Sequence, residues 1–88
     1  MKELICDVKP FIMQQTICQY DTETGVMTPL GTCTIDELKD TLLAYAHQQD
    51  IFNFHLYGDK HILSELGKEL DFACYQKYSY KTYTISYN

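Results

Sequence analysis

The sequence contains no arginine, and all seven of its basic residues are lysine. Arginine is the side chain that most often binds phosphates and guanine bases through two parallel hydrogen bonds. Twelve acidic residues outnumber the lysines, so the formal net charge is −5 at pH 7. The lack of arginine and the negative charge predict that the chain does not bind nucleic acid.

Long apolar runs are also missing, and no stretch approaches the roughly 18 apolar residues that a membrane helix needs. Glu3 and Asp7 interrupt the apolar run near the N-terminus, and no small-residue cleavage site of a secretory signal follows. We therefore expect a cytoplasmic protein that does not bind membranes.

No CxxC pair occurs among the four cysteines, Cys6, Cys18, Cys33 and Cys74. Each has apolar or strand-forming neighbours, and a free cysteine behaves as a small hydrophobic residue. An even number of cysteines also permits a disulfide framework, but nothing else in the chain indicates secretion. Reduced, buried thiols are the expected state.

The chain has 88 residues, of which 45% are hydrophobic and eight are tyrosine. This length supports one hydrophobic core, so we expect a single domain over residues 1–88. A core of this size is thin, which favours a dimer that buries further apolar surface.

Strand-forming residues dominate residues 3–20, which are rich in Ile, Val, Phe, Thr and Tyr. Pro10 cannot donate a backbone hydrogen bond, so it marks an edge position, a bulge or a break. The stretch YDTETGVM follows at residues 20–27, and Gly25 suits the left-handed position of a short loop. The pattern predicts a β-hairpin whose return strand covers about residues 26–33.

A capping box opens the first predicted helix, because Glu37 follows Thr34 by three residues in the stretch TIDEL. Apolar residues then recur at helical spacing and form one stripe, which comprises Ile35, Leu38, Leu42, Tyr45 and Ala46. Residues 51–57 are nearly all apolar or aromatic, which is typical of a central strand covered on both faces.

A second helix is predicted from about residue 60 to residue 72. Its inward-facing residues are Ile62, Leu63, Leu66, Leu70 and Ala73. Gly67 weakens this helix by roughly 1 kcal/mol relative to alanine unless close packing requires a glycine. The last stretch, YSYKTYTISYN, predicts a half-exposed strand, because its residues alternate between two faces. One face carries Lys81, Tyr83, Ile85 and Tyr87, and the other carries Tyr80, Thr82, Thr84 and Ser86.

The order of these elements is hairpin, helix, strand, helix and strand. It predicts an α/β fold that borders on α+β, with a mixed sheet of about four strands and two helices on one face. This order is similar to part of an RNase H-like or actin-like domain, in which an antiparallel hairpin precedes alternating helices and strands. The similarity covers the order of the elements, includes no diagnostic motif and assigns no functional residue.

Gly58 and Asp59 lie where a strand meets a helix, a position that attracts ligands in open α/β sheets. The chain has neither a GxGxxG fingerprint nor a GxxxxGK[ST] loop, and Asp59 would repel a phosphate. An aspartate there serves better as the N-cap of the helix. We predict a turn and a cap at this junction.

Four carboxylates could in principle supply the cluster that a two-metal nuclease of the RNase H-like kind needs: Asp7, Asp21, Glu37 and Asp59. Local roles already account for two of them, because Asp21 belongs to the turn and Glu37 to the capping box. We therefore expect no catalytic residue and no cofactor.

Histidine and cysteine do not form a metal-binding pattern either. Structural zinc sites use closely spaced ligand pairs, which the three histidines do not provide. These are His47, His55 and His61. No base is positioned beside a cysteine, so Cys–His catalysis has no support. We expect no metal site.

Tyrosines cluster near the C-terminus, at Tyr75, Tyr78, Tyr80, Tyr83 and Tyr87. They are compatible with strand packing, with a protein interface or, less well, with base stacking, because only two lysines accompany them. A terminal strand with so little charge invites pairing with another copy. We predict a homodimer with Tyr80, Tyr83 and Tyr87 near its interface.

The leading hypothesis is a small non-enzymatic interaction or assembly module that binds itself or another protein. One alternative is a metal-dependent hydrolase or nuclease that uses Asp7 and Asp59. Another is an acidic inhibitor that mimics nucleic acid with the carboxylates of residues 1–59. An exposed tyrosine-rich edge favours the module, converging carboxylates favour the enzyme, and a single acidic stripe favours the mimic.

Overall fold

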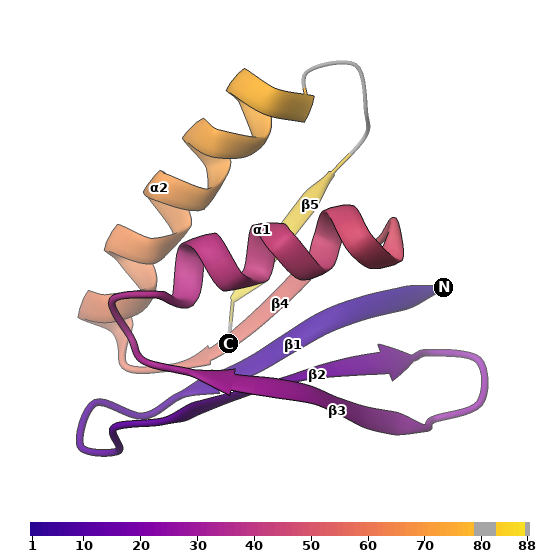
Figure 1. The fold of residues 1–88 in the computed structure, drawn as a ribbon, viewed down its shortest axis with the longest axis horizontal. Coiled ribbons are helices and arrows are strands. Elements are labelled where there is room, and N and C mark those ends of the chain that lie inside the picture. Colours follow the sequence, from indigo (N-terminus) through magenta and orange to yellow (C-terminus); the bar gives the residue numbers. More distant parts are fainter. Residues whose placement is uncertain (79–82, 88) are drawn as a thin grey trace.

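The computed structural model describes residues 1–78 and 83–87, with the backbone alone for Lys77 and Tyr78. The elements are β1 (Lys2–Val8), β2 (Gln15–Asp21), β3 (Met27–Cys33), α1 (Leu38–Gln49), β4 (Asn53–Gly58), α2 (Lys60–Tyr78) and β5 (Thr84–Tyr87). The described strands form one sheet with the order β3-β2-β1-β4-β5, which is accompanied by the two helices (Figure 1). Neither helix is long and apolar enough to cross a membrane.

The sheet is mixed, as the sequence predicts. Strands β1, β2 and β3 pair antiparallel, whereas β4 is parallel to β1 and β5 is parallel to β4. The sheet has five strands rather than about four, because residues 3–20 contribute two strands. The loop between β1 and β2 contains Pro10, which marks a break in the strand. The observed order of elements otherwise matches the α+β arrangement that the sequence indicates.

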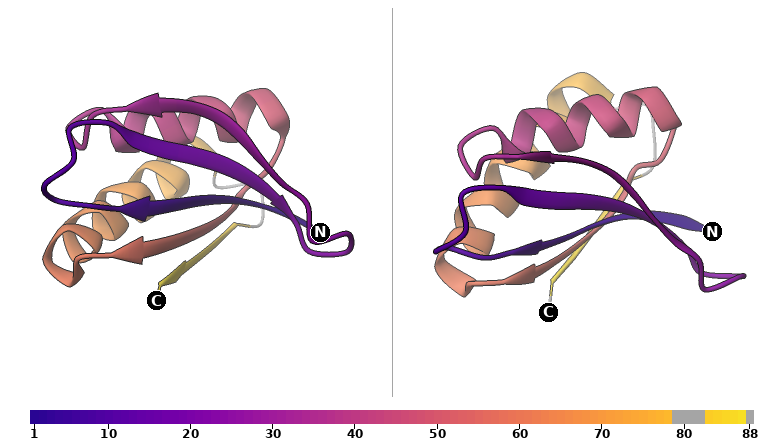
Figure 2. Two further views of the ribbon diagram at one scale, coloured as in Figure 1. Left: turned by 90° about the horizontal axis from the view of Figure 1, so that it is seen from below. Right: turned by 60° about the horizontal axis from the view of Figure 1, so that its bottom comes forward.

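Both helices lie on one face of the sheet, and the other face has no helix over it (Figure 2). Because side chains alternate along a strand, every second strand residue points into the core between the sheet and the helices. The core residues include Leu4, Cys6, Val8, Ile17, Leu38, Leu42, Ala46, Phe54, Leu56, Leu63, Leu66, Leu70 and Cys74. This arrangement confirms the prediction that the helices pack on one face.

The prediction that residues 51–57 form a strand covered on both faces is wrong. Phe54 and Leu56 of β4 are completely buried under the helices, but His55 and Tyr57 on the other face are partly exposed. The apolar and aromatic composition of this segment therefore reflects its central place beside β1, and not burial on both sides.

The hairpin between β2 and β3 has the predicted turn. Gly25 adopts a left-handed conformation with φ of 74°, which glycine reaches without a steric penalty. Oδ1 of Asp21 accepts a hydrogen bond from the backbone N–H of Glu23 at 3.0 Å. This bond lowers the pKa of the Asp21 carboxyl, because the backbone N–H stabilises the ionised form.

The capping box at Thr34 is present, but the α-helix starts later than this motif suggests. The N–H of Thr34 donates to Oε1 of Glu37 at 3.2 Å, and the N–H of Glu37 donates to Oγ1 of Thr34 at 3.3 Å. Residues 35–37 form a tight turn, and α1 begins at Leu38. The reciprocal bonds therefore stabilise the turn that leads into the helix.

Helix α2 continues past the predicted end near residue 72 and reaches Tyr78. Cys74 is fully buried on its inner face, one turn after the buried Leu70. Tyr75, which the sequence groups with the tyrosines of the last strand, is thus an exposed helical residue. Tyr80 and Lys81 lie outside the described residues.

Candidate interaction surface

Gly58 ends β4 in a conformation that only glycine adopts readily, with φ of +120°. A Cβ atom at this position would overlap the backbone carbonyl of Val8 on the neighbouring strand β1. Oδ2 of Asp59 then accepts a hydrogen bond from the N–H of Ile62 at 3.1 Å, which caps the first turn of α2. The predicted turn and cap are both present.

We expect the Asp59→Ala variant to lower the free energy of unfolding by about 1 kcal/mol, because it removes the side-chain cap of α2. Glu69→Ala is the matched control, since Glu69 is an exposed carboxylate on the same helix. Urea unfolding of both variants measures the difference. Equal stabilities for the two variants would contradict the capping role of Asp59.

Asp7 and Asp59 lie near the carboxyl ends of two neighbouring strands, because β1 and β4 are parallel and Asp7 is paired with Tyr57. Each carboxylate has a local partner, however. Asp59 caps α2, and the carboxylate of Asp7 lies 3.8 Å from the ammonium of Lys9. Within the described residues, no group of three His, Cys, Asp or Glu side chains could hold a metal ion.

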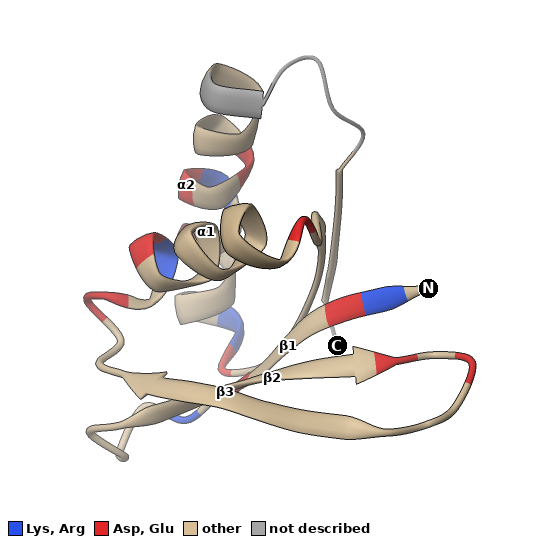
Figure 3. Cartoon of the chain, turned by 45° about the vertical axis from the view of Figure 1, so that its right-hand side comes forward, with Lys and Arg blue, Asp and Glu red and all other residues tan. Residues whose placement is uncertain are grey.

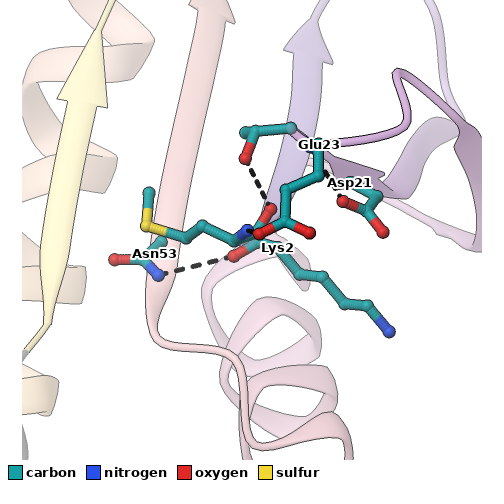
Figure 4. A network of polar contacts seen from close by, with 6 residues as sticks. Lys2, Asp21, Glu23 and Asn53 are labelled. Carbon is teal, nitrogen blue, oxygen red and sulfur yellow. Dashed lines mark hydrogen bonds and ion pairs between the residues drawn. The ribbon is translucent and has the colours of Figure 1, made fainter.

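The acidic residues are distributed over β1, the loop between β2 and β3, and both helices (Figure 3). One of them, Glu23, has a structural partner at the end of the sheet where the N-terminus lies, because its carboxylate is 3.6 Å from the N-terminal ammonium (Figure 4). At the same end, Asn53 donates a hydrogen bond to the carbonyl of Lys2 at 3.4 Å. These contacts fasten the β2–β3 loop and β4 to β1.

His55 lies on the sheet face that has no helix over it. Its Nδ1 atom is 3.8 Å from the carboxylate of Glu3, and its ring stacks on Tyr57 with the ring centres 4.6 Å apart. The imidazole is thus packed between neighbouring side chains. His61, by contrast, is exposed on the first turn of α2.

The four cysteines are free thiols, and three of them are buried: Cys6, Cys33 and Cys74. Burial raises the pKa of the Cys6 thiol to about 12 and that of Cys74 to about 11. These thiols are therefore protonated and unreactive near neutral pH. The prediction of reduced, buried thiols is thus confirmed for these three cysteines, whereas Cys18 is only half-buried.

The side chains of β5 alternate as predicted. Tyr83, Ile85 and Tyr87 face α2, whereas Thr84 and Ser86 are exposed on the opposite face. The Tyr83 hydroxyl donates a hydrogen bond to Oδ1 of Asp71 at 2.8 Å, and this bond raises the pKa of the phenol. The tyrosine accordingly remains a protonated donor at neutral pH.

Gly67 lies within α2 because the hydroxyl of Tyr87 occupies the space that a Cβ atom would fill. Close packing thus accounts for the glycine in the middle of α2, which is the exception that the sequence analysis named. Burial also raises the pKa of the Tyr87 phenol, although half of this residue is exposed. The two tyrosines therefore rest against the side of α2 and leave one flank open to solvent.

An open groove of about 790 Å³ runs between α2 and β5. Its apolar lining comes from Leu63 and Gly67 of α2, from Ile85 and Tyr87 of β5, and from Tyr83 directly before β5. Lys60, Lys68 and Asp71 of α2 border it. None of the ion pairs found in the described part of the chain involves either lysine. We call this the α2/β5 groove.

Strand β5 is the edge of the sheet next to this groove. Its inner edge is bound firmly, because the N–H of Thr84 donates to the carbonyl of Phe52 at 3.0 Å and its hydroxyl donates to Asn53 at 2.7 Å. Successive residues of a strand direct their backbone groups to opposite edges. The N–H and C=O groups of Ile85 and Tyr87 therefore point outward, away from β4, and so does the C=O of Tyr83, which shares a peptide group with the N–H of Thr84.

The loop between β1 and β2 is a second exposed feature, and it was not predicted from the sequence. Phe11 is 98% exposed and Met13 is 83% exposed, although both are large and apolar. The buried side chain of Gln15 holds this loop through bonds to Lys9 and Ile12. The apolar stretch PFIM, at residues 10–13, could have indicated this exposed loop. It was missed because the whole of residues 3–20 was interpreted as strand-forming.

No protein-family model matches the chain, and the search of curated proteins returns no match. The function of the chain must therefore be argued from its own surfaces.

Proposed function

We propose that the protein is a small, non-enzymatic, cytoplasmic interaction module that assembles through the outer edge of β5, first with a second copy of itself. The observation that carries this proposal is the outward-directed backbone of β5 beside the α2/β5 groove. Unpaired strand edges bind other strands through main-chain hydrogen bonds, and adjacent pockets take up alternate side chains.

The energetics of a small chain support the same function. Tyr87 is 50% exposed, and its ring forms part of the groove. Tyrosine is enriched at protein interfaces, because it covers a large area and has few torsions to fix. Pairing along β5 would bury the rings of Tyr83 and Tyr87 further and would satisfy the outward backbone groups. Symmetric dimers are the commonest assembly of soluble proteins.

Neither alternative function, the hydrolase or the nucleic-acid mimic, is supported by an observation comparable to the open edge of β5. For a hydrolase, Asp7 and Asp59 would have to give up their contacts with Lys9 and with the first turn of α2. For a mimic of nucleic acid, the acidic residues would have to form one stripe, whereas they are spread over strands, a loop and helices. The β5 edge remains the surface best suited to binding.

Analytical ultracentrifugation of the Ile85→Pro variant tests this function. At micromolar concentration we expect the wild type to sediment with twice the monomer mass of 10.3 kDa and the variant to sediment as a monomer. Proline removes the outward N–H of Ile85, and edge strands tolerate it when that N–H faces solvent.

The matched control is Ile85→Val, which keeps the N–H and a β-branched side chain and should remain dimeric. Far-ultraviolet circular dichroism shows whether Ile85→Pro is still folded. A monomeric wild type, or a dimer that persists in a folded Ile85→Pro variant, would disprove the proposed function.

A further inference from the structure

Two contacts fix the position of β5 along α2. The hydroxyl of Tyr83 binds Asp71, and the hydroxyl of Tyr87 lies against Gly67. The strand and the helix therefore run in opposite directions, and Ile85, the residue midway between the tyrosines, lies beside residues 67–71 of α2. This part of the helix includes one lysine and one aspartate on the border of the α2/β5 groove, Lys68 and Asp71.

Antiparallel pairing of two β5 strands about a twofold axis at Ile85 follows from the directions of the backbone groups. Ile85 would pair with Ile85 of the second copy, and Tyr83 would pair with Tyr87 of the second copy. Since Ile85 directs its N–H and C=O groups outward, the Ile85 pair exchanges both of its hydrogen bonds, and the N–H of Tyr87 donates to the carbonyl of Tyr83 of the second copy. The tyrosine rings would then form cross-strand pairs on the helix side of the sheet.

The same axis brings the two copies of α2 together. Helix α2 packs against both β4 and β5, and its residues Lys68 and Asp71 border the α2/β5 groove. Pairing of the two β5 strands would place the groove-facing sides of the two helices opposite each other across the axis. Each helix would therefore cover the α2/β5 groove of the other copy.

We propose that Lys68 and Asp71 of the two copies form a closed ring of alternating charge across this twofold axis, an inference that rests on the proposed function. Because the helices are antiparallel and the axis passes residues 67–71, Lys68 of each copy faces Asp71 of the other. Oδ1 of Asp71 receives the Tyr83 hydroxyl, which leaves Oδ2 for the lysine. The ring favours a second copy over an unrelated strand.

Charge reversal tests the ring by sedimentation equilibrium. We expect Asp71→Lys to raise the dissociation constant of the dimer about tenfold or more, because it places like charges in contact twice. Tyr83→Phe is the matched control for the lost hydroxyl bond, and it should raise the constant less than Asp71→Lys does. The double variant K68E/D71K restores opposite charges, so its dissociation constant should return to within about threefold of the wild type.

Mixing the isotope-labelled wild type with K68E/D71K tests selectivity by native mass spectrometry. Each mixed dimer would join Lys68 to a lysine and Asp71 to a glutamate, so we expect mixed dimers well below the statistical half. Unhindered mixing, or a double variant that stays as weak as Asp71→Lys, would overturn the ring while leaving the β5 dimer intact. A wild type that is monomeric, with β5 left for a strand of another protein, would overturn both proposals.

Discussion

Replacing Gly58 by alanine should lower the free energy of unfolding by about 3 kcal/mol or more, and we expect this to be the largest effect of a single added methyl group. The backbone of Gly58 has φ of +120°, in a region that side chains with a Cβ atom rarely enter. The added methyl group would also overlap the carbonyl of Val8, which is paired with Gly58 where β1 and β4 end. Relief of this overlap requires β1 and β4 to separate.

Gly25 provides the matched control, because it also has a positive φ, of 74°, but no atom lies within 4 Å of the position of its Cβ. Gly25→Ala should therefore cost only the left-handed conformation, about 1 kcal/mol. Chemical denaturation of the two variants under identical conditions measures the difference. Similar losses at both sites would show that the approach of Val8 does not constrain β4.

Gln15→Ala should destabilise the protein by about 3 kcal/mol, because it removes three hydrogen bonds and leaves partly buried backbone groups without these partners. The Gln15 side chain is 2% exposed, and its amide accepts from the N–H of Lys9 at 2.8 Å. It also donates to the carbonyls of Lys9 at 2.8 Å and of Ile12 at 2.6 Å. No other side chain of the described residues replaces these bonds, so the β1–β2 loop should lose its fixed shape.

The neighbouring residue supplies the control, since Gln14 has the same side chain but is exposed. Gln14→Ala should change the stability by less than about 0.5 kcal/mol. Thermal unfolding of both variants measures the difference, and limited proteolysis should cut the loop of Gln15→Ala near Phe11 first. A Gln15→Ala variant as stable as Gln14→Ala would show that the amide does not hold the loop.

Local patterns in the sequence were sufficient for much of the fold. Gly25 placed the hairpin, Thr34 and Glu37 identified the approach to α1, and Asp59 identified the start of α2. Each of these signals acts within a few residues, so a single sequence contains the whole interaction. The alternation of Tyr83 to Tyr87 likewise gave the correct faces of β5.

Features that depend on distant contacts could not be predicted. The role of Gly67 is set by Tyr87, twenty residues further along the chain, and the bond between Asp71 and Tyr83 is also tertiary. The α2/β5 groove exists only because these two elements pack together. The sequence shows more tyrosines than a core of this size can hold, but it does not show that Tyr83 and Tyr87 pack against α2.

The fifth strand was missed for a different reason. Strand propensity is nearly continuous over residues 3–20, and it does not reveal where the chain turns back. Gln15 fixes that turn through bonds to Lys9 and Ile12. The sequence around Gln15 has no local pattern that predicts these bonds, so Pro10 was the only residue that indicated the break.

Residue-resolved amide hydrogen exchange of the β5 strand tests most directly whether the protein assembles through this edge. In a single copy the amides of Ile85 and Tyr87 point outward, whereas those of Thr84 and Ser86 point toward β4. We predict that the outward amides exchange slowly at concentrations where the protein is dimeric, and that dilution removes this protection. Fast exchange of the Ile85 amide in a sample that sediments as a dimer would contradict the account.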